Sequence, residues 1–157
     1  CAPTAIRTFM KWGADIPEQF TLAVSLHSAI QSTRNKLMPG VKKYTLLRLH
    51  EALQLYTEKT GRRPTYEYAM IEGVNDTNPE MQALCDFCEG TLCHVNLIQL
   101  NDIEGSPLKP SPIHKVEDLQ RRLESRGIET TIRNSRGNDI DAACGQLKQR
   151  FKVQKNA

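Results

Sequence analysis

Four segments of strand length alternate with helical segments along this chain, and this alternation restricts its fold more than any other feature. The strand-like segments are rich in apolar, β-branched and aromatic residues and cover residues 20–27, 64–71, 94–101 and 129–133. Apolar residues recur at helical spacing over residues 6–12, 46–56, 81–88 and 116–123, and residues 33–38 are expected to form one helical turn. Strands that alternate with helices form right-handed crossover units around a parallel sheet. The chain is therefore predicted to adopt an α/β fold with parallel strands.

The sequence also predicts where two of the helices begin or end. Gly61 follows the helix that includes residues 46–56 and is expected to end it in the left-handed conformation. Asn78 is the expected N-cap of the next helix, with Pro79 as its first residue. Three or four parallel strands leave an open sheet edge, which is an association hazard for a free-standing protein. Because the chain also begins with Cys1 and not with Met, we expect that a preceding part is missing.

Composition and charge restrict the setting of the protein. The 157 residues fit one globular domain, no apolar run approaches the ~20 residues of a membrane span, and no secretory signal is visible. Five cysteines without a disulfide-framework spacing favour a reducing compartment, so we expect a cytoplasmic protein. The net charge of +3 is small, but residues 130–157 carry +4. This basic segment is either a solvated tail or a surface that contacts phosphates.

Polar residues near the strand ends are the first candidates for a binding site, because ligands of parallel α/β proteins gather at the carboxyl ends of the strands. These ends fall at Ser25–His27, at residues 72–75 and at Gln99–Asn101. His27 is interpreted as an acid or base, a ligand or a packing group. Asn96, Asn101 and Glu67 lie in otherwise apolar segments. Each of them either contacts a ligand or braces the structure through hydrogen bonds.

The cysteines fall into two groups. Cys85 and Cys88 form a C-x-x-C pair but lie on the apolar face of a predicted helix, which favours packing over redox or metal chemistry. Cys93 and His94 extend the pair toward a zinc-like pattern, although a fourth ligand at suitable spacing is missing. Cys144 lies among small residues with cations on both sides, which favours a reactive thiolate. An inert loop thiol agrees equally well with the same features.

Seven segments carry a resemblance to a known family. They are Leu22–Ser28, Asn35–Pro39, Thr60–Arg63, Tyr66–Ala69, Gly73–Asp76, His94–Ile98 and Arg136–Leu147. In order and spacing they resemble the radical S-adenosylmethionine (SAM) enzymes that methylate C2 of adenine in RNA, the RlmN/Cfr-like family. The last segment, R-G-x-D-I-D-A-A-C-G-Q-L with Asn138 at the variable position, is the most specific of them.

The resemblance implies an architecture, two cofactors and a set of site residues. Residues 1–147 would form the C-terminal part of a radical SAM core domain, a portion of a partial (β/α)6 barrel, and residues 148–157 would form a basic C-terminal tail. The cofactors would be SAM and a [4Fe-4S] cluster whose ligand cysteines lie upstream of this chain. The residues implied to bind SAM are Ser25, Leu26, His27 and Asn101. Cys144 would carry the methyl group as S-methylcysteine, and a second cysteine outside this chain would resolve the RNA adduct through a disulfide.

The resemblance also implies partners, and the departures from it limit what this chain does alone. The implied partners are 23S rRNA, with tRNA as a further target, and an external reductant; the full-length protein would be a monomer without membrane contact. The C-x3-C-x2-C cluster motif of the family is absent. We therefore expect the isolated chain to bind no cluster and to methylate no RNA. The alternative interpretation is a non-catalytic RNA-binding half-barrel or a degenerate remnant.

Overall fold

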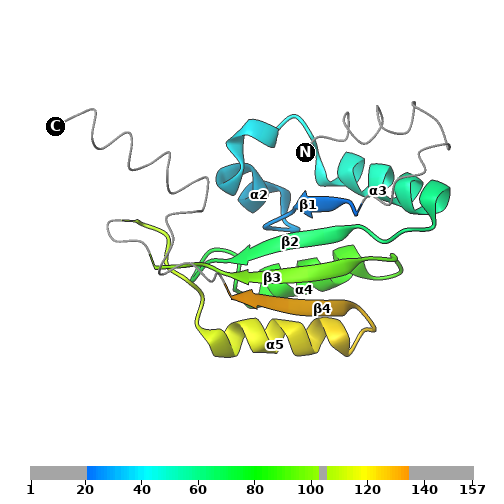
Figure 1. The fold of residues 1–157 in the computed structure, drawn as a ribbon. Coiled ribbons are helices and arrows are strands. Elements are labelled where there is room, and N and C mark those ends of the chain that lie inside the picture. Colours follow the sequence, from blue (N-terminus) through cyan, green and yellow to red (C-terminus); the bar gives the residue numbers. More distant parts are fainter. Residues whose placement is uncertain (1–20, 103–105, 135–157) are drawn as a thin grey trace.

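The computed structural model describes residues 21–102 and 106–134, which include a parallel four-stranded sheet (Figure 1). In chain order the strands are β1 (Ala23–Ser25), β2 (Thr65–Met70), β3 (His94–Gln99) and β4 (Glu129–Asn134). Their order in the sheet is the same as in the sequence, and each neighbouring pair is parallel. The predicted α/β fold with parallel strands is confirmed. The helix predicted over residues 6–12 lies outside the described residues.

Helices connect each strand to the next. They are α2 (Gln31–Leu37), the short 3-10 helix η1 (Pro39–Val41), α3 (Leu46–Thr60), α4 (Asn78–Cys88) and α5 (Ile113–Glu124) (Figure 1). The first three lie between β1 and β2, α4 lies between β2 and β3, and α5 lies between β3 and β4. Parallel pairing requires such crossover connections. Within residues 21–102 and 106–134, no helix has the length and apolar character needed to cross a membrane.

The hydrophobic core lies between one face of the sheet and the helices. Alternate residues of β2 point into it: Tyr66, Tyr68 and Met70 are at most 1% exposed, while the residues between them are only partly buried. The helices contribute Leu49 from α3, Leu84 from α4 and Leu119 from α5. Each fully buried Leu side chain stabilises the fold by about 2 kcal/mol. The period of two along the strands therefore leaves polar side chains, such as that of Glu67, on the opposite face.

Two boundaries of the elements explain where the prediction succeeds and fails. Gly61 ends α3 with φ +65°, as predicted. The N-cap of α4 is Thr77, whose backbone is extended, so the prediction of Asn78 as the cap is wrong by one residue. Asn78 Oδ1 instead accepts a hydrogen bond from Arg122 Nη2 of α5 at 2.9 Å. The side chain that would cap the helix is thus engaged by a neighbouring helix, which local sequence cannot reveal.

Candidate functional site

The carboxyl end of β1 is marked by a strained residue, His27. Among the non-glycine residues that the structure describes, it has the one positive φ, +56°, a conformation that costs a residue with a side chain about 1–2 kcal/mol. The N–H groups of Leu26 and His27 both donate to the Glu67 carbonyl, at 3.0 and 3.3 Å. The ring Nδ1 accepts from the Ala69 N–H at 3.1 Å. These bonds hold His27 against β2 and end β1 earlier than the predicted segment 20–27.

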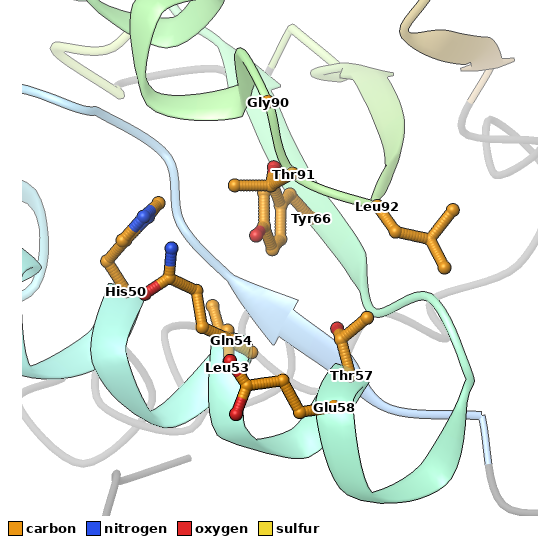
Figure 2. A pocket seen from close by; sticks show the side chains of 9 residues that line it. All are labelled: His50, Leu53, Gln54, Thr57, Glu58, Tyr66, Gly90, Thr91 and Leu92. Carbon is orange, nitrogen blue, oxygen red and sulfur yellow. The ribbon is translucent and has the colours of Figure 1, made fainter.

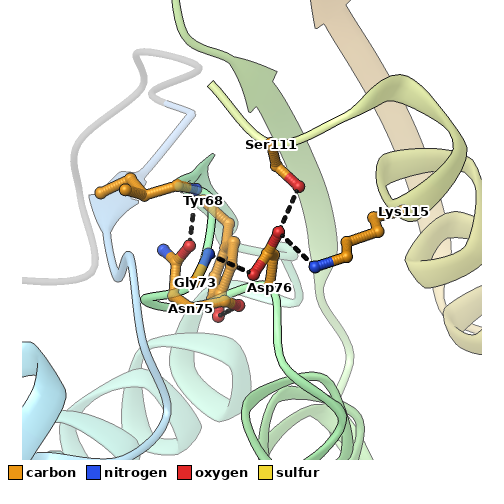
Figure 3. Close-up of polar contacts among 7 residues, drawn as sticks. Tyr68, Gly73, Asn75, Asp76, Ser111 and Lys115 are labelled. Atoms are coloured by element: carbon orange, nitrogen blue, oxygen red, sulfur yellow. Dashed lines mark hydrogen bonds and ion pairs between the residues drawn. The ribbon is translucent and has the colours of Figure 1, made fainter. Parts of the chain in front are cut away.

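Asn75 lies in the turn after β2 and bonds both strand ends. It is fully buried, and its Nδ2 donates to the carbonyls of His27 and Ala69, each at 2.7 Å. Its Oδ1 accepts from the Ile71 N–H at 2.7 Å, and its own carbonyl accepts from Tyr68 Oη at 2.9 Å (Figure 3). Every hydrogen-bonding group of this amide is therefore used to join β1, β2 and the turn.

Asp76, the next residue, anchors the same turn to α5. Its carboxylate side chain is 0% exposed, and Oδ1 accepts from the Gly73 N–H at 2.8 Å. Oδ2 accepts from Ser111 Oγ at 2.8 Å and from Lys115 Nζ at 2.9 Å (Figure 3). Burial by itself raises the pKa of Asp76, but the hydrogen bonds from Lys115, Ser111 and Gly73 outweigh it and leave the pKa below its ordinary value. The carboxylate is therefore charged at neutral pH and held by three donors.

A second buried acid fixes the chain just after His27. Ser28 Oγ donates to Glu80 Oε2 of α4 at 2.7 Å, and it accepts from the Ile30 N–H at 2.9 Å. Ser28 is 0% exposed and Glu80 is 4% exposed. Because a buried carboxylate without a donor is costly, this bond ties the start of α2 to α4. His27 is thus held from both sides, by Asn75 at its carbonyl and by Glu80 through the following residue.

A row of polar side chains crosses the face of the sheet that does not form the core. Ser25, Glu67, Asn96 and Thr131 occupy the same level of β1, β2, β3 and β4. Asn96 Nδ2 donates to both carboxylate oxygens of Glu67, at 3.1 and 3.2 Å. Asn96 Oδ1 accepts from Thr131 Oγ1 at 3.3 Å. Asn96 is therefore braced by side chains of neighbouring strands, while this face remains polar.

Comparison with known proteins gives these features a context. No family model matches the chain. It is 44% identical over 137 residues to the probable dual-specificity RNA methyltransferase RlmN of Alkaliphilus oremlandii, a match that covers 87% of this chain and 40% of that protein. The protein of the same name from Flavobacterium psychrophilum is 42% identical over 144 residues, which cover 92% of this chain and 42% of the relative. The chain is homologous to a part of the RlmN proteins.

Two solved structures have folds similar to that of the RlmN-like chain. A radical SAM methyltransferase from Sphaerobacter thermophilus matches it with a TM-score of 0.82 at 40% identity, over 92% of this chain and 41% of that one. A domain of pyruvate-formate lyase-activating enzyme from Bacteroides vulgatus has a TM-score of 0.58 at 16% identity, over 72% of this chain and 66% of that domain, and shares the fold alone. The predicted portion of a radical SAM barrel is confirmed. The chain spans about 40% of the length of the curated relatives it matches.

The structure brings some of the predicted site residues together. Ser25, Leu26 and His27 lie at the end of β1, and Asn101 lies two residues beyond the end of β3, at the same edge of the sheet. Leu26 is 0% exposed and packs in the core, so only its backbone is available to a ligand. Cys144, the segment Arg136–Leu147 and the predicted tail 148–157 lie outside the described residues. Which groups bind SAM and which carries a methyl group therefore stay predictions.

The cysteines of α4 and the following turn belong to the core of the RlmN-like chain. Cys85, Cys88 and Cys93 are free and buried. Burial raises the pKa of Cys85, and a hydrogen bond with Cys93 raises the pKa of Cys88 while it lowers that of Cys93 to about 7. In the described part of the chain, no three His, Cys, Asp or Glu side chains are grouped as metal ligands. The described cysteines do not fit a [4Fe-4S] cluster, because no three of them are grouped as ligands.

Arg34 of α2 is a buried cation close to this edge. It is 2% exposed, its Nη1 donates to the Tyr44 carbonyl at 3.3 Å, and its Nε has no hydrogen-bond partner among the residues described. Burial lowers the pKa of Arg34. Burial also lowers the pKa of His27; the Glu67 carboxylate opposes this effect and the Arg34 guanidinium adds to it. A buried cation without a carboxylate costs several kcal/mol, so an anionic partner would stabilise this region.

A cavity at the opposite end of the sheet is separate from these residues. It has a volume of about 280 Å³ and lies between α3 and the turn that precedes β3 (Figure 2). Its lining includes His50 and Gln54 from α3, Tyr66 near the start of β2, and Leu92. Because ligands of this fold bind at the carboxyl ends of strands, this cavity at the amino ends is not part of the candidate site.

Proposed function

We propose that the native protein containing this chain is a radical SAM methyltransferase that methylates C2 of adenine in 23S rRNA. One observation carries the proposal: the chain is 44% identical over 137 residues to an RlmN protein. The TM-score of 0.82 with a solved radical SAM methyltransferase supports it. The arrangement of the carboxyl edge supports it, because polar groups converge there on the rigid ends of β1 and β2. The chain would contribute one part of the barrel, and the remaining part would hold the [4Fe-4S] cluster.

The residues of this chain would have two roles. Ser25, His27 and Asn101 would contact SAM through their polar groups, and Leu26 would do so through its backbone. The thiolate of Cys144 would attack the methyl carbon of SAM, so that a sulfur–carbon bond forms while the sulfonium–carbon bond breaks and S-adenosylhomocysteine leaves. Adenine C2 is not a nucleophile, so a radical route through S-methylcysteine would be required at this carbon. A cysteine thiolate outside this chain would then attack the Cys144 sulfur, so that a disulfide forms while the bond from that sulfur to the carbon on the RNA breaks, and this carbon takes up a proton to become the methyl group.

The setting of the reaction belongs to the same proposal. The described cysteines are free thiols, which supports a reducing compartment and hence the cytoplasm. An external reductant would supply electrons, and the full-length protein would act as a monomer. The basic stretch of residues 130–157, with net charge +4, would contact RNA phosphates. The words "dual-specificity RNA methyltransferase" in the name of the relatives support a second RNA substrate, for which we propose transfer RNA.

The decisive assay measures methylation of adenine at C2. The native protein, reconstituted anaerobically with iron and sulfide, is incubated with SAM, a reductant and either a 23S rRNA fragment or tRNA, and 2-methyladenosine is measured by mass spectrometry. We expect product with the wild type and with Cys93→Ala, and none with Cys144→Ala. Product from Cys144→Ala would contradict the role of that cysteine. Salt-dependent RNA binding without any product from the wild type would favour the non-catalytic RNA-binding half-barrel.

A further inference from the structure

The hydrogen bond at the His27 ring determines which nitrogen carries the proton. The donor is the backbone N–H of Ala69, and the acceptor is Nδ1, at 3.1 Å. A backbone amide can only donate, so Nδ1 must be unprotonated, and the proton of the neutral ring lies on Nε2. No residue of the described ranges accepts a hydrogen bond from Nε2. The ring therefore presents one N–H donor at the carboxyl edge of the sheet.

The position of this donor depends on a backbone that is unfavourable by itself. His27 has φ +56°, and residues with a β-carbon populate this region about tenfold less than their ordinary conformations. The Asn75 amide bonds the His27 carbonyl and the Ala69 carbonyl, each at 2.7 Å. The same Ala69 residue supplies the N–H that holds the ring. One buried side chain thus fixes both the backbone of His27 and the residue that orients its imidazole.

We infer that His27 serves as a neutral hydrogen-bond donor through Nε2, toward an acceptor oxygen of SAM, and that Asn75 is the positioning residue that aims it. The inference rests on the proposed function, because it takes SAM as the ligand at this edge. It gives the G-V-N-D turn at residues 73–76 a role beyond closing a loop. The side chains of Asn75 and Asp76, which both lie in this turn, differ in that role. Asn75 contacts His27, whereas the Asp76 carboxylate accepts its hydrogen bonds from residues other than His27.

The first test needs no ligand and no variant of the turn. The cluster-free native protein is labelled with ¹⁵N-histidine, the His27 signals are assigned with His27→Asn, and the two ring nitrogens are observed by NMR at pH 7. We expect an unprotonated Nδ1 and a protonated Nε2. A ring protonated at Nδ1, or a rapid mixture of both tautomers, would overturn the inference whatever the protein binds.

The second test separates positioning from stability. Asn75→Asp keeps an acceptor for the Ile71 N–H but loses both donated bonds, and Asn75→Ser is a smaller change in case the first variant does not fold. Asp76→Asn disturbs the same turn without touching His27 and serves as the matched control. If alignment of His27 is lost, the Kd for SAM rises by about tenfold, because the competent fraction falls by that factor. The control should bind SAM with the wild-type Kd.

The outcomes of the two tests distinguish the inference from the proposed function. Weaker SAM binding in the Asn75 variants, with wild-type binding in Asp76→Asn, supports the inference. Unchanged binding in a folded Asn75 variant, or equal weakening in Asp76→Asn, overturns it and leaves the proposed function standing. A native protein that does not bind SAM at all overturns the proposed function, and the inference about the ligand with it.

Discussion

Replacement of Asp76 by Asn is expected to destabilise the fold by about 2–4 kcal/mol at pH 7. The carboxylate accepts from one donor at Oδ1 and from two donors at Oδ2. An amide in its place has one oxygen, so its NH2 group must face at least one of the three donors. A hydrogen bond to a charged group contributes about 1.5–3 kcal/mol, and the remaining bonds weaken when the charge is lost. Urea unfolding of the wild type and the variant, followed by circular dichroism, measures the difference.

The difference in unfolding free energy between the wild type and Asp76→Asn should depend on pH if it comes from the charge of the Asp76 carboxylate. The pKa of Asp76 in the folded protein lies below its ordinary value of 3.8, so the carboxylate stabilises the fold fully above that pH. As the pH falls below 3.8, the unfolded chain takes up a proton first, and the advantage over Asp76→Asn should shrink by about 1.4 kcal/mol per pH unit until the folded pKa is reached. Asp102→Asn is the matched control, because Asp102 is 64% exposed and, among residues 21–102 and 106–134, pairs with Lys109 alone; it should cost less than about 1 kcal/mol. A difference that stays constant from pH 6 to pH 2 would refute this account of the turn.

Three further predictions follow from burial and backbone geometry. Cys85 and Cys88, at most 1% exposed, should resist iodoacetamide until the protein is unfolded, as measured by peptide mass spectrometry; rapid labelling in the folded state would restore the redox interpretation. Gly61→Ala should cost about 1–2 kcal/mol in urea unfolding, because φ is +65° while an added β-carbon meets nothing within 4 Å; an unchanged midpoint would contradict this. Arg34→Met should leave the ligand-free protein as stable as the wild type or up to a few kcal/mol more stable, and a thermal unfolding scan showing a large loss would indicate that Arg34 has an anionic partner already.

The fold was predictable because its signals are local. The alternation of apolar strands and amphipathic helices requires no knowledge of distant contacts, and Gly61 marks the end of α3 by its own conformational freedom. The same signals placed Ser25–His27 at a carboxyl edge, where the structure puts them. The prediction for Asn78 failed because its partner, Arg122, is 44 positions away in the sequence. Local preference cannot choose between a cap and such a distant bond.

The buried hydrogen bonds around this turn were not predictable for the same physical reason. Asn75 and Asp76 lie in the turn that follows β2, where polar residues are ordinary, so local sequence does not reveal that they are buried or which groups they bond. Their partners His27 and Lys115 are 48 and 39 positions away. Glu80 gave no signal, because an acid in the first turn of a helix is ordinary. Its burial depends on Ser28, which is 52 positions away.

The central claim is that this chain belongs to a methyltransferase in which Cys144 carries the methyl group. The most direct measurement is peptide mass spectrometry of the native protein from its source cells, directed at the tryptic peptide of residues 137–148, which contains Cys144 as its one cysteine. The account predicts S-methylcysteine at Cys144 and unmodified thiols at Cys85, Cys88 and Cys93. An unmodified Cys144 in a protein that forms 2-methyladenosine in RNA would contradict it.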